Sequence, residues 1–244
     1  MKHGCVIVSG ANTGIGLATV SALVAQGYAV IALSHRKREP ALKIFERHNA
    51  LKPGSVRDYY LDLTDTDKVK SLIRELRDLE IAGLVNNAAA LPENRLFVMT
   101  PLQSFREIFE INFFAQINLT QLTVRLMLRD HSHQPRSIVN VSSIAALDGE
   151  PGQCEYVTSK AALIGMTYKL ARELSPVNIR VNAIAPGLTD TGMLSSLDPE
   201  LKTAALQRSA GGRVLRPEEI ARTVAYLISD ASSGINGQVL KILA

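Results

Sequence analysis

The chain has 244 residues, of which 46% are hydrophobic and 20% charged, and its formal net charge is +4. This length and apolar content are enough to bury the core of one α/β domain. Positive and negative residues are interspersed, which does not indicate a nucleic acid partner, and no apolar stretch approaches the ~20 residues that span a bilayer. The two distant cysteines, Cys5 and Cys154, indicate neither a disulfide framework nor a zinc site. We expect a cytoplasmic protein without a bound metal.

Short apolar runs alternate with longer amphipathic stretches. The runs that we predict as strands are 5–10, 29–33, 58–63, 83–88, 137–143, 179–186 and 237–243. Their apolar middles are typical of parallel strands covered on both faces. Helical patterns lie near 14–26, 40–51, 66–79, 101–130, 157–174 and 217–229. The alternation predicts one α/β domain over residues 1–244, a Rossmann-type doubly wound parallel sheet of seven strands flanked by helices.

Two stretches stand out from this pattern. Residues 105–128 are apolar on nearly all sides, so a helix there is expected to be buried, with its outer face against a partner subunit or a covering loop. Residues 187–212 contain glycine and serine and lie between a predicted strand and a predicted helix. Long irregular connections of this kind are often lids, so we expect a substrate loop there.

The first predicted strand runs into the glycine-rich turn SGANTGIG and then into a helix. Glycines let the backbone turn sharply and approach a pyrophosphate, and the helix N-terminus presents free N–H groups to it. Because this turn stands at the first strand–helix junction of an alternating chain, it predicts a nucleotide-binding loop rather than a plain turn. The residues assigned to the cofactor here are Ser9, Gly10, Asn12, Thr13, Gly14, Ile15 and Gly16.

The second predicted strand ends in Ser34-His35-Arg36. A cofactor with a free ribose 2′-hydroxyl is expected to meet a carboxylate about 20 residues past the glycines. None stands there, since Glu39 comes too late, and cations at this place suit a 2′-phosphate. We therefore predict NADPH rather than NADH, with Arg36 best placed for the phosphate and His35 and Lys37 as alternates. The other interpretation is a solvated loop with stray cations.

Tyr156 and Lys160 stand four residues apart in EYVTSKAAL, so on a helix they share one face. Such a pair occurs by chance in many helices and does not by itself indicate catalysis. Ser143 stands thirteen residues before Tyr156, and NNAA, at 86–89, and Asn112 come earlier in the chain. Together with the glycine loop, this ordered set resembles the short-chain dehydrogenase/reductase family over nearly the whole chain. Ser9 replaces the usual threonine and Ala89 a glycine of the family's motifs.

The resemblance implies roles for individual residues. The catalytic set would be Asn112, Ser143, Tyr156 and Lys160. Further cofactor contacts would come from Asp62 and Leu63 at the adenine, from Asn86 and Ala88 after the fourth strand, from Tyr156 and Lys160 themselves, and from Pro186, Gly187, Thr189 and Thr191 at the nicotinamide carboxamide.

The chemistry of these residue types fits reduction of a carbonyl group. A tyrosine has an ordinary pKa near ~10, and the Lys160 ammonium with a positive nicotinamide would lower it. A tuned tyrosine can give a proton to a carbonyl oxygen as hydride reaches the carbon. Ser143 would hydrogen-bond the same oxygen, whereas Ser142 points to the opposite face of a regular strand and is assigned a backbone or packing role. For Asn112 the alternative is that it satisfies a buried backbone carbonyl.

Within the family the chain resembles the 3-oxoacyl-[acyl-carrier-protein] reductase branch, in NNAA, the helix of Tyr156, VNAIAPG and RPEEIARTVAYLIS. This implies reduction of a 3-oxoacyl thioester in fatty acid or polyketide biosynthesis, by a homotetramer or else a dimer. Two features depart from the branch. Residues 175–178 (SPVN) lack the basic residue that often docks the carrier protein, and Gly237 leads into QVLKILA in place of a Val-Asp-Gly-Gly turn. Arg125 and Arg129 remain as docking cations.

Two alternatives stay open at this point. The substrate could be a free keto compound such as a steroid, a sugar or a small alcohol, or the protein could bind NADPH as a regulator without turnover. His131 and His133 form an H-x-H without further ligands, which predicts a solvated loop rather than a metal site. Cys154 is a candidate to line the pocket and is assigned no chemistry.

Overall fold

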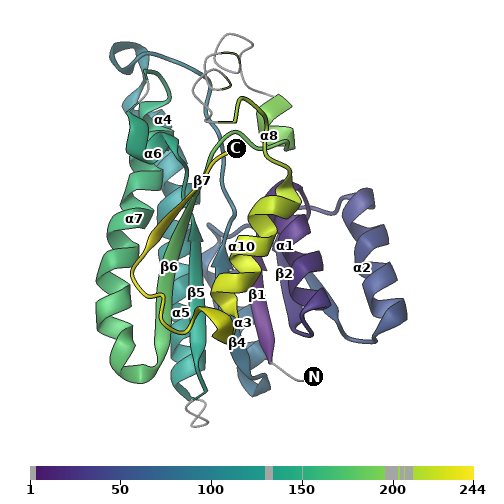
Figure 1. Ribbon diagram of the computed structural model, residues 1–244. Coiled ribbons are helices and arrows are strands. Elements are labelled where there is room, and N and C mark those ends of the chain that lie inside the picture. Colours follow the sequence, from purple (N-terminus) through teal and green to yellow (C-terminus); the bar gives the residue numbers. More distant parts are fainter. Residues whose placement is uncertain (1–3, 130–133, 150, 196–202, 204–205, 207–210) are drawn as a thin grey trace.

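A parallel sheet of seven strands forms the centre of the computed structural model, in the order β3-β2-β1-β4-β5-β6-β7 (Figure 1). The structure describes residues 4–129, 134–149, 151–195, 203, 206 and 211–244. The strands are β1 Cys5–Ser9, β2 Ala29–Ser34, β3 Val56–Tyr60, β4 Ile81–Asn86, β5 Arg136–Val141, β6 Ile179–Pro186 and β7 Val239–Ile242. The predicted α/β fold with a doubly wound, seven-stranded sheet is confirmed.

The strand order reverses beside β1, which pairs with β2 on one side and with β4 on the other. The chain runs outward from β1 to β3, returns to β4 and then continues to β7. At such a switch point the loops after neighbouring strands diverge and leave a crevice at the carboxyl ends. The crevice therefore lies between the loops that follow β1 and β4.

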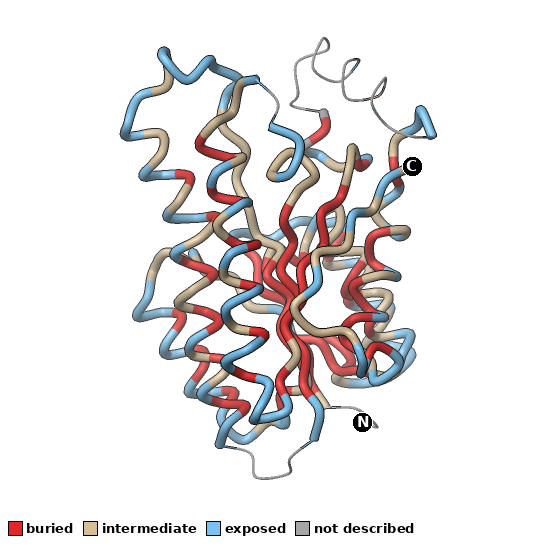
Figure 2. The backbone as a smooth tube through the Cα atoms, turned by 60° about the vertical axis from the view of Figure 1, so that its left-hand side comes forward, coloured by how far each residue is buried: buried red, intermediate tan, exposed pale blue. Residues whose placement is uncertain are grey.

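Helices cover both faces of the sheet. Successive side chains of a strand face opposite sides, so Val6 and Val8 pack in one hydrophobic cluster and Ile7 in the other. The first cluster includes α1 Gly14–Ala25, α2 Glu39–Leu51 and α10 Pro217–Ile228, and the second α3 Thr66–Glu75, α5 Ala115–Arg129 and α7 Cys154–Leu174. Figure 2 shows buried residues along the strands and on the inner sides of the helices. None of the described helices is long and apolar enough to cross a membrane.

Shorter elements connect these layers. They are the helices α4 Leu102–Phe109, α6 Ala145–Asp148 and α8 Gly192–Ser195, and the 3-10 turns Leu76–Asp78, Phe97–Met99, Ser175–Val177 and Asp230–Ser232. The predicted helix 66–79 accordingly ends in a 3-10 turn, and β3 ends at Tyr60, before the predicted residue 63.

The long predicted helix 101–130 is divided in the structure. A π-helical turn, Glu110–Phe114, separates α4 from α5. A π turn changes the helical period, which a 3.6-residue pattern does not reveal. In the single chain the outer face of this helix is uncovered, since Ile111 is 36% and Phe114 50% exposed, and the partner subunit expected against it stays a prediction. The predicted helix 157–174 begins earlier, at Cys154, so Tyr156 lies in its first turn.

The predicted substrate loop leaves the sheet after β6, and its two ends are hydrogen-bonded to each other. Thr189 and Leu215 form an isolated parallel bridge, in which the Leu215 N–H donates to the Leu188 carbonyl and the Asp190 N–H to the Leu215 carbonyl, both at 2.8 Å. Residues 196–202, 204–205 and 207–210 of this loop lie outside the described residues, as do His131 and His133.

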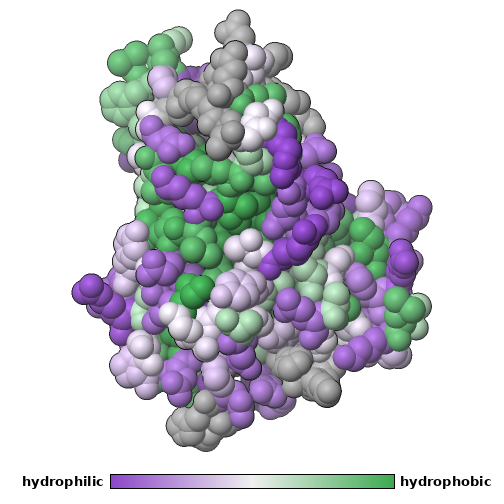
Figure 3. All heavy atoms as spheres, in the orientation of Figure 1, coloured by the Kyte–Doolittle hydropathy of each residue, from purple (hydrophilic) through white to green (hydrophobic). Residues whose placement is uncertain are grey.

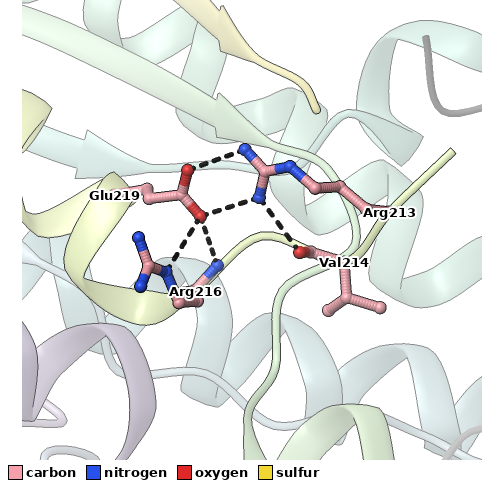
Figure 4. A network of polar contacts seen from close by, with 4 residues as sticks. All are labelled: Arg213, Val214, Arg216 and Glu219. Carbon is pink, nitrogen blue, oxygen red and sulfur yellow. Dashed lines mark hydrogen bonds and ion pairs between the residues drawn. The ribbon is translucent and has the colours of Figure 1, made fainter. Parts of the chain in front are cut away.

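A charged network fixes the chain where it returns from this loop to α10. The Arg213 guanidinium donates to both carboxylate oxygens of Glu219, at 2.8 and 2.9 Å, and the Arg216 backbone N–H donates to the same carboxylate at 2.8 Å (Figure 4). Because Glu219 lies in the first turn of α10, the network ties the end of the loop to the start of that helix.

Candidate active site

A cavity of about 840 Å³ opens at the carboxyl edge of the sheet, where the loops after β1, β4, β5 and β6 meet. The sequence-predicted residues that line it are Gly10, Thr13, Gly14, Ile15, Arg36, Ala88, Ser143, Tyr156, Lys160, Pro186, Gly187, Thr189 and Thr191. Those that do not line it are Ser9, Asn12, Gly16, Ser34, His35, Asp62, Leu63, Asn86 and Asn112. Lining residues that sequence reasoning missed include Arg38, Asn87, Leu91, Gln153 and Leu194.

Ser143, Tyr156 and Lys160 come together on one wall of this cavity. The side chains of Ser143 and Tyr156 are hydrogen-bonded. The Lys160 Nζ lies 5.9 Å from the centre of the Tyr156 ring and donates to the Val141 carbonyl at 2.8 Å. Ser143 directly follows β5, and its Oγ accepts from the Ala145 N–H at 3.2 Å. A hydroxyl, a phenol and an amine thus converge from the end of β5 and the first two turns of α7.

Ser142 has a different role from its neighbour. Its side chain is buried, and its Oγ donates to the Lys160 backbone carbonyl at 2.9 Å. It therefore holds α7 against β5, which is the backbone role predicted for it.

Asn112 lies in the π turn and is fully buried. Its Oδ1 accepts from the Ala90 N–H at 2.8 Å, and its Nδ2 donates to the Ala90 carbonyl at 3.0 Å and to the Ser159 Oγ at 3.1 Å. This geometry agrees with the alternative interpretation, in which the asparagine satisfies buried backbone groups. The side chain does not reach the cavity.

Burial sets the pKa values of the two titratable groups in opposite directions. Burial raises the pKa of Tyr156, and the hydrogen bond with Ser143 opposes that change. Burial lowers the pKa of Lys160 to about 8. We expected the Lys160 ammonium together with a positive nicotinamide to lower the pKa of Tyr156, and the protein's own groups raise it. Loss of hydration disfavours the phenolate more than the nearby groups favour it.

The glycine loop is held by the segment that follows β4. The Asn87 Nδ2 donates to the carbonyls of Ser9 and Gly10 at 3.0 and 3.1 Å. The backbone N–H groups of Asn87 and Ala88 donate to the Ser9 Oγ at 2.9 and 3.0 Å. Ser9 and Asn87 therefore shape the loop. An added Cβ at Gly16 would lie 2.0 Å from the Gly10 carbonyl oxygen, so only glycine fits there.

The N-terminus of α1 suits an anionic group. Thr13 precedes this helix but makes no side-chain cap, and the first turn has no acidic residue. Its early N–H groups are therefore free of a capping side chain, and Gly14 and Ile15 line the cavity. Free N–H groups and the helix dipole favour a phosphate there. Asn12 supports the arrangement, since its Nδ2 donates to the Arg36 carbonyl at 2.6 Å.

The cations after β2 divide into two pairs. Arg36 and Arg38 both line the cavity. His35 instead lies 3.9 Å from the Asp62 carboxylate, and the Lys37 Nζ lies 5.4 Å from the centre of the Tyr60 ring. Side chains of an extended segment alternate in direction, which accounts for the division. The predicted alternates His35 and Lys37 are turned toward Asp62 and Tyr60, and Arg38, which was not predicted, lines the cavity.

Three residues predicted at the cofactor do not line this cavity. Asp62 accepts from the Thr64 N–H and hydroxyl at 2.9 and 2.8 Å, bonds that lower the pKa of its carboxyl. Leu63 packs against the second hydrophobic cluster. The Asn86 side chain is buried between helix and sheet, where its Nδ2 donates to Thr120 and Asn140, both at 2.8 Å.

The segment after β6 forms a further part of the cavity wall. The Gly187 N–H donates to the Ile242 carbonyl at 2.9 Å, and the Thr189 hydroxyl donates to the Gly187 carbonyl at 2.9 Å. Thr191 packs against Gly14, where an added Cβ would lie 2.7 Å from its methyl group. Among the residues that the structure describes, no cluster of three His, Cys, Asp or Glu side chains could hold a metal ion.

Known proteins resemble this chain in sequence and in fold. The family model described as Enoyl-(Acyl carrier protein) reductase matches residues 10–242. A 3-oxoacyl-[acyl-carrier-protein] reductase of Thermotoga maritima is 37% identical over 97% of this chain and 94% of its own. A 3alpha-hydroxysteroid dehydrogenase of Mediterraneibacter gnavus is 32% identical, over 99% and 96%. A solved structure from Beutenbergia cavernae, described as an NAD(P)-dependent gluconate 5-dehydrogenase with bound NADP, has a TM-score of 0.87 at 29% identity, covering 97% of this chain and 94% of that one.

The chain belongs to the short-chain dehydrogenase/reductase family of oxidoreductases, as its motifs predicted. The names of these relatives span acyl-carrier-protein, steroid and gluconate chemistry. Family membership therefore defines the class of reaction and leaves the substrate open.

The buried amine of Lys160 generates a stability prediction. Its pKa of about 8 lies below the ordinary 10.5, so between these values the unfolded chain binds more protons than the folded one and stability rises with pH. Below pH 8 the fold contains a buried ammonium. We expect Lys160→Met to raise the unfolding free energy at pH 7 by roughly 1–3 kcal/mol, and we expect this gain to shrink as pH rises toward 10.5. Denaturant unfolding of both proteins across this pH range measures the difference in their unfolding free energies. A difference that does not change with pH would contradict the prediction.

Proposed function

We propose that the protein is an NADPH-dependent ketoreductase that converts a 3-oxoacyl thioester into the 3-hydroxyacyl thioester. The observation that carries the proposal is the convergence of Ser143, Tyr156 and Lys160 on one wall of a cavity that also contains the glycine loop. Relatives named 3-oxoacyl-[acyl-carrier-protein] reductase, at 31% to 37% identity over nearly the full chain, support the thioester.

Residues of the cavity are suited to hold NADPH. The glycine loop and the α1 N-terminus would bind the pyrophosphate, Arg36 and Arg38 the 2′-phosphate, and the segment 186–191 the carboxamide. Two similar solved structures are described with bound NADP, which supports this assignment. The chemistry that the cofactor supplies when bound is a hydride for the carbonyl carbon.

Tyr156 acts as the acid in this proposal. Its raised pKa keeps the phenol protonated near neutral pH, which is the form that donates a proton to the carbonyl oxygen. Ser143 hydrogen-bonds the same oxygen as negative charge develops on it. The Lys160 ammonium, 5.9 Å from the ring centre, stabilises the phenolate that is left after proton transfer. The phenolate then regains a proton from solvent.

The part of the cavity around β5, β6 and α7 favours an apolar substrate. Its lining residues include Leu91, Ile144, Ala145, Val157, Leu188 and Leu194, with the Gln153 amide among them. Among the described lining residues, the only charged side chains are Arg36, Arg38 and Lys160, and none is acidic. A sugar acid would leave its hydroxyl and carboxylate groups with few partners, whereas an acyl chain loses little on entering such a pocket.

If a carrier protein docks on Arg125 and Arg129, the active site that it reaches would be that of a neighbouring subunit. Both arginines are exposed in the second half of α5. This helix starts beside the cavity edge and ends just before β5 begins, at the opposite edge of the sheet (Figure 1). Docking there would therefore serve the active site of another copy of the chain.

An oligomer is consistent with the exposed apolar groups. Phe114 on the π turn and Tyr168 on α7 are 50% and 52% exposed, and Tyr226 on α10 and Leu243 after β7 are 40% and 46% exposed. Figure 3 shows hydrophobic residues gathered over β7, on the face between α7 and α10. We propose one twofold interface through α5 and α7 and a second through α10 and β7, which gives a homotetramer, or a dimer if only the first forms.

Turnover tests the proposed reaction. NADPH absorbance should fall when an acetoacetyl thioester is added, and fall much more slowly with a 3-ketosteroid or a keto-sugar acid.

Tyr156→Phe removes the donated proton and should lower kcat by ~10²–10⁴-fold, and Ser143→Ala by ~10²–10³-fold. The matched control is Tyr168→Phe, an exposed tyrosine of the same helix. A Tyr156→Phe enzyme that keeps more than a tenth of the rate would refute the role of this tyrosine, and faster turnover of a free ketone would reassign the substrate. NADPH binding without turnover of any compound would favour a regulator.

Cofactor selectivity tests the two arginines. Arg36→Ala and Arg38→Ala should each weaken NADPH binding roughly 10- to 150-fold, for a loss of the ~1.5–3 kcal/mol of a charged hydrogen bond, and should barely change NADH. Lys37→Ala is the control, because Lys37 lies over Tyr60. The measurement is the dissociation constant of each cofactor at low and high salt. Because salt screens the attraction between the arginines and the 2′-phosphate, high salt should reduce the preference for NADPH over NADH. Equal affinities for both cofactors in the unmodified protein would rule out 2′-phosphate recognition.

The state of assembly is checked by light scattering at micromolar concentration. We expect a tetramer. Phe114→Lys should break the interface through α5 and α7 and leave at most a dimer, because burying an unpaired ammonium is costly. A monomeric unmodified protein would contradict both interfaces.

A further inference from the structure

Ser159 is a fully buried residue of α7. It stands three residues after Tyr156 and directly before Lys160, in the same turn of the helix. Its Oγ donates to the Tyr156 backbone carbonyl at 2.7 Å and accepts from the Asn112 Nδ2 at 3.1 Å. Both hydrogen-bonding capacities of the hydroxyl are therefore used inside the protein.

The other contacts of Asn112 lead to the cofactor side of the cavity. Its amide exchanges two hydrogen bonds with the Ala90 backbone, at 2.8 and 3.0 Å. Ala90 directly follows Ala88 and Ala89, both of which line the cavity. One buried amide thus connects the chain after β4 to the turn of α7 that bears the proposed proton donor.

This connection has only one link on the α7 side. In the described part of the chain, Ser159 is the only α7 residue to which the Asn112 side chain is hydrogen-bonded. Ser142 and Asn140 bond α7 to the chain at β5, whereas the bond between Ser159 and Asn112 joins α7 to the segment after β4. The bond from Asn112 to Ser159 ties this turn of α7 to a residue outside the helix, and the bond from Ser159 to the Tyr156 carbonyl joins Tyr156 to the same hydroxyl.

We infer that Ser159 is a positioning residue, which through Asn112 sets the distance between the Tyr156 hydroxyl and the cofactor wall at Ala88–Ala90. The inference rests on the proposed function, because it concerns the geometry of that proton transfer. Small displacements of a reacting group are expensive, with about 1 Å costing on the order of 10²-fold in rate.

The test compares two helical hydroxyls one residue apart. Ser159→Ala should lower kcat about tenfold or more with an acetoacetyl thioester, while KM for NADPH changes less than about twofold, since a misplaced acid affects the transition state and not cofactor binding. Thr158→Ala is the matched control, because the Thr158 hydroxyl also donates to a carbonyl of its own helix, that of Cys154 at 2.7 Å, but is exposed and does not contact Asn112. It should leave kcat unchanged. Melting curves of both variants show whether the fold is kept.

Two further variants separate positioning from loss of structure. Ser159→Cys keeps the size and a weak donor, and should restore part of the lost kcat. Adding Ser159→Ala to Asn112→Ala should cost nothing more in kcat, because both changes cut the same link. An unmodified enzyme that turns over the thioester while Ser159→Ala matches it in kcat would overturn this inference alone. An unmodified protein that binds NADPH and reduces no ketone would overturn the proposed function and this inference together.

Discussion

The site depends on one cross-link between the ends of β1 and β4. These strands are neighbours at the point where the strand order reverses, and their loops would otherwise diverge. The Asn87 amide binds the carbonyls of Ser9 and Gly10, and the Ser9 hydroxyl accepts two N–H groups in return. Because the backbone groups of the glycine loop are satisfied in this way, the loop can hold a left-handed conformation at Gly10, with φ of 63°, beside an open cavity.

A second set of buried polar groups connects β4 through β5 to α7. The Asn86 Nδ2 bonds to Asn140, and the Asn140 Nδ2 bonds to Thr167 of α7, at 2.8 and 2.9 Å. Asn112 and Ser159 make a parallel connection nearer the cavity. Buried amides cost free energy unless they are paired, so each of these bonds specifies one arrangement of β4, β5 and α7. An apolar layer would hold the same elements together but would tolerate small shifts of α7.

The sequence allowed correct predictions where a feature depends on a local pattern of residues. It did not where the feature depends on the direction in which a side chain points. The i, i+4 spacing of Tyr156 and Lys160 and the position of the glycine loop follow from helix and strand periods. Whether Asn86 or Asn87 faces the loop, however, depends on where β4 ends, and we chose the one that turned out to be buried. Lys37 was named as an alternate cation and Arg38 was not considered for the same reason, because one residue of register reverses the side of an extended chain. The π turn around Asn112 left no trace in the hydrophobic period.

The opposite effects of burial on Tyr156 and Lys160 follow from one environment. Tyr156 is 9% and Lys160 2% exposed, and in such surroundings the neutral form of each group is favoured. The phenol is thereby kept as an acid, while the amine is held near the pH at which it gains its charge, with a pKa of about 8. In the proposed reaction, the negative charge that Tyr156 acquires on giving up its proton would appear in a low dielectric, where a nearby ammonium and the Ser143 hydroxyl would stabilise it far more than they would in water. The burial that costs the folded protein stability at Lys160 would therefore also give these groups their effect on the proposed reaction.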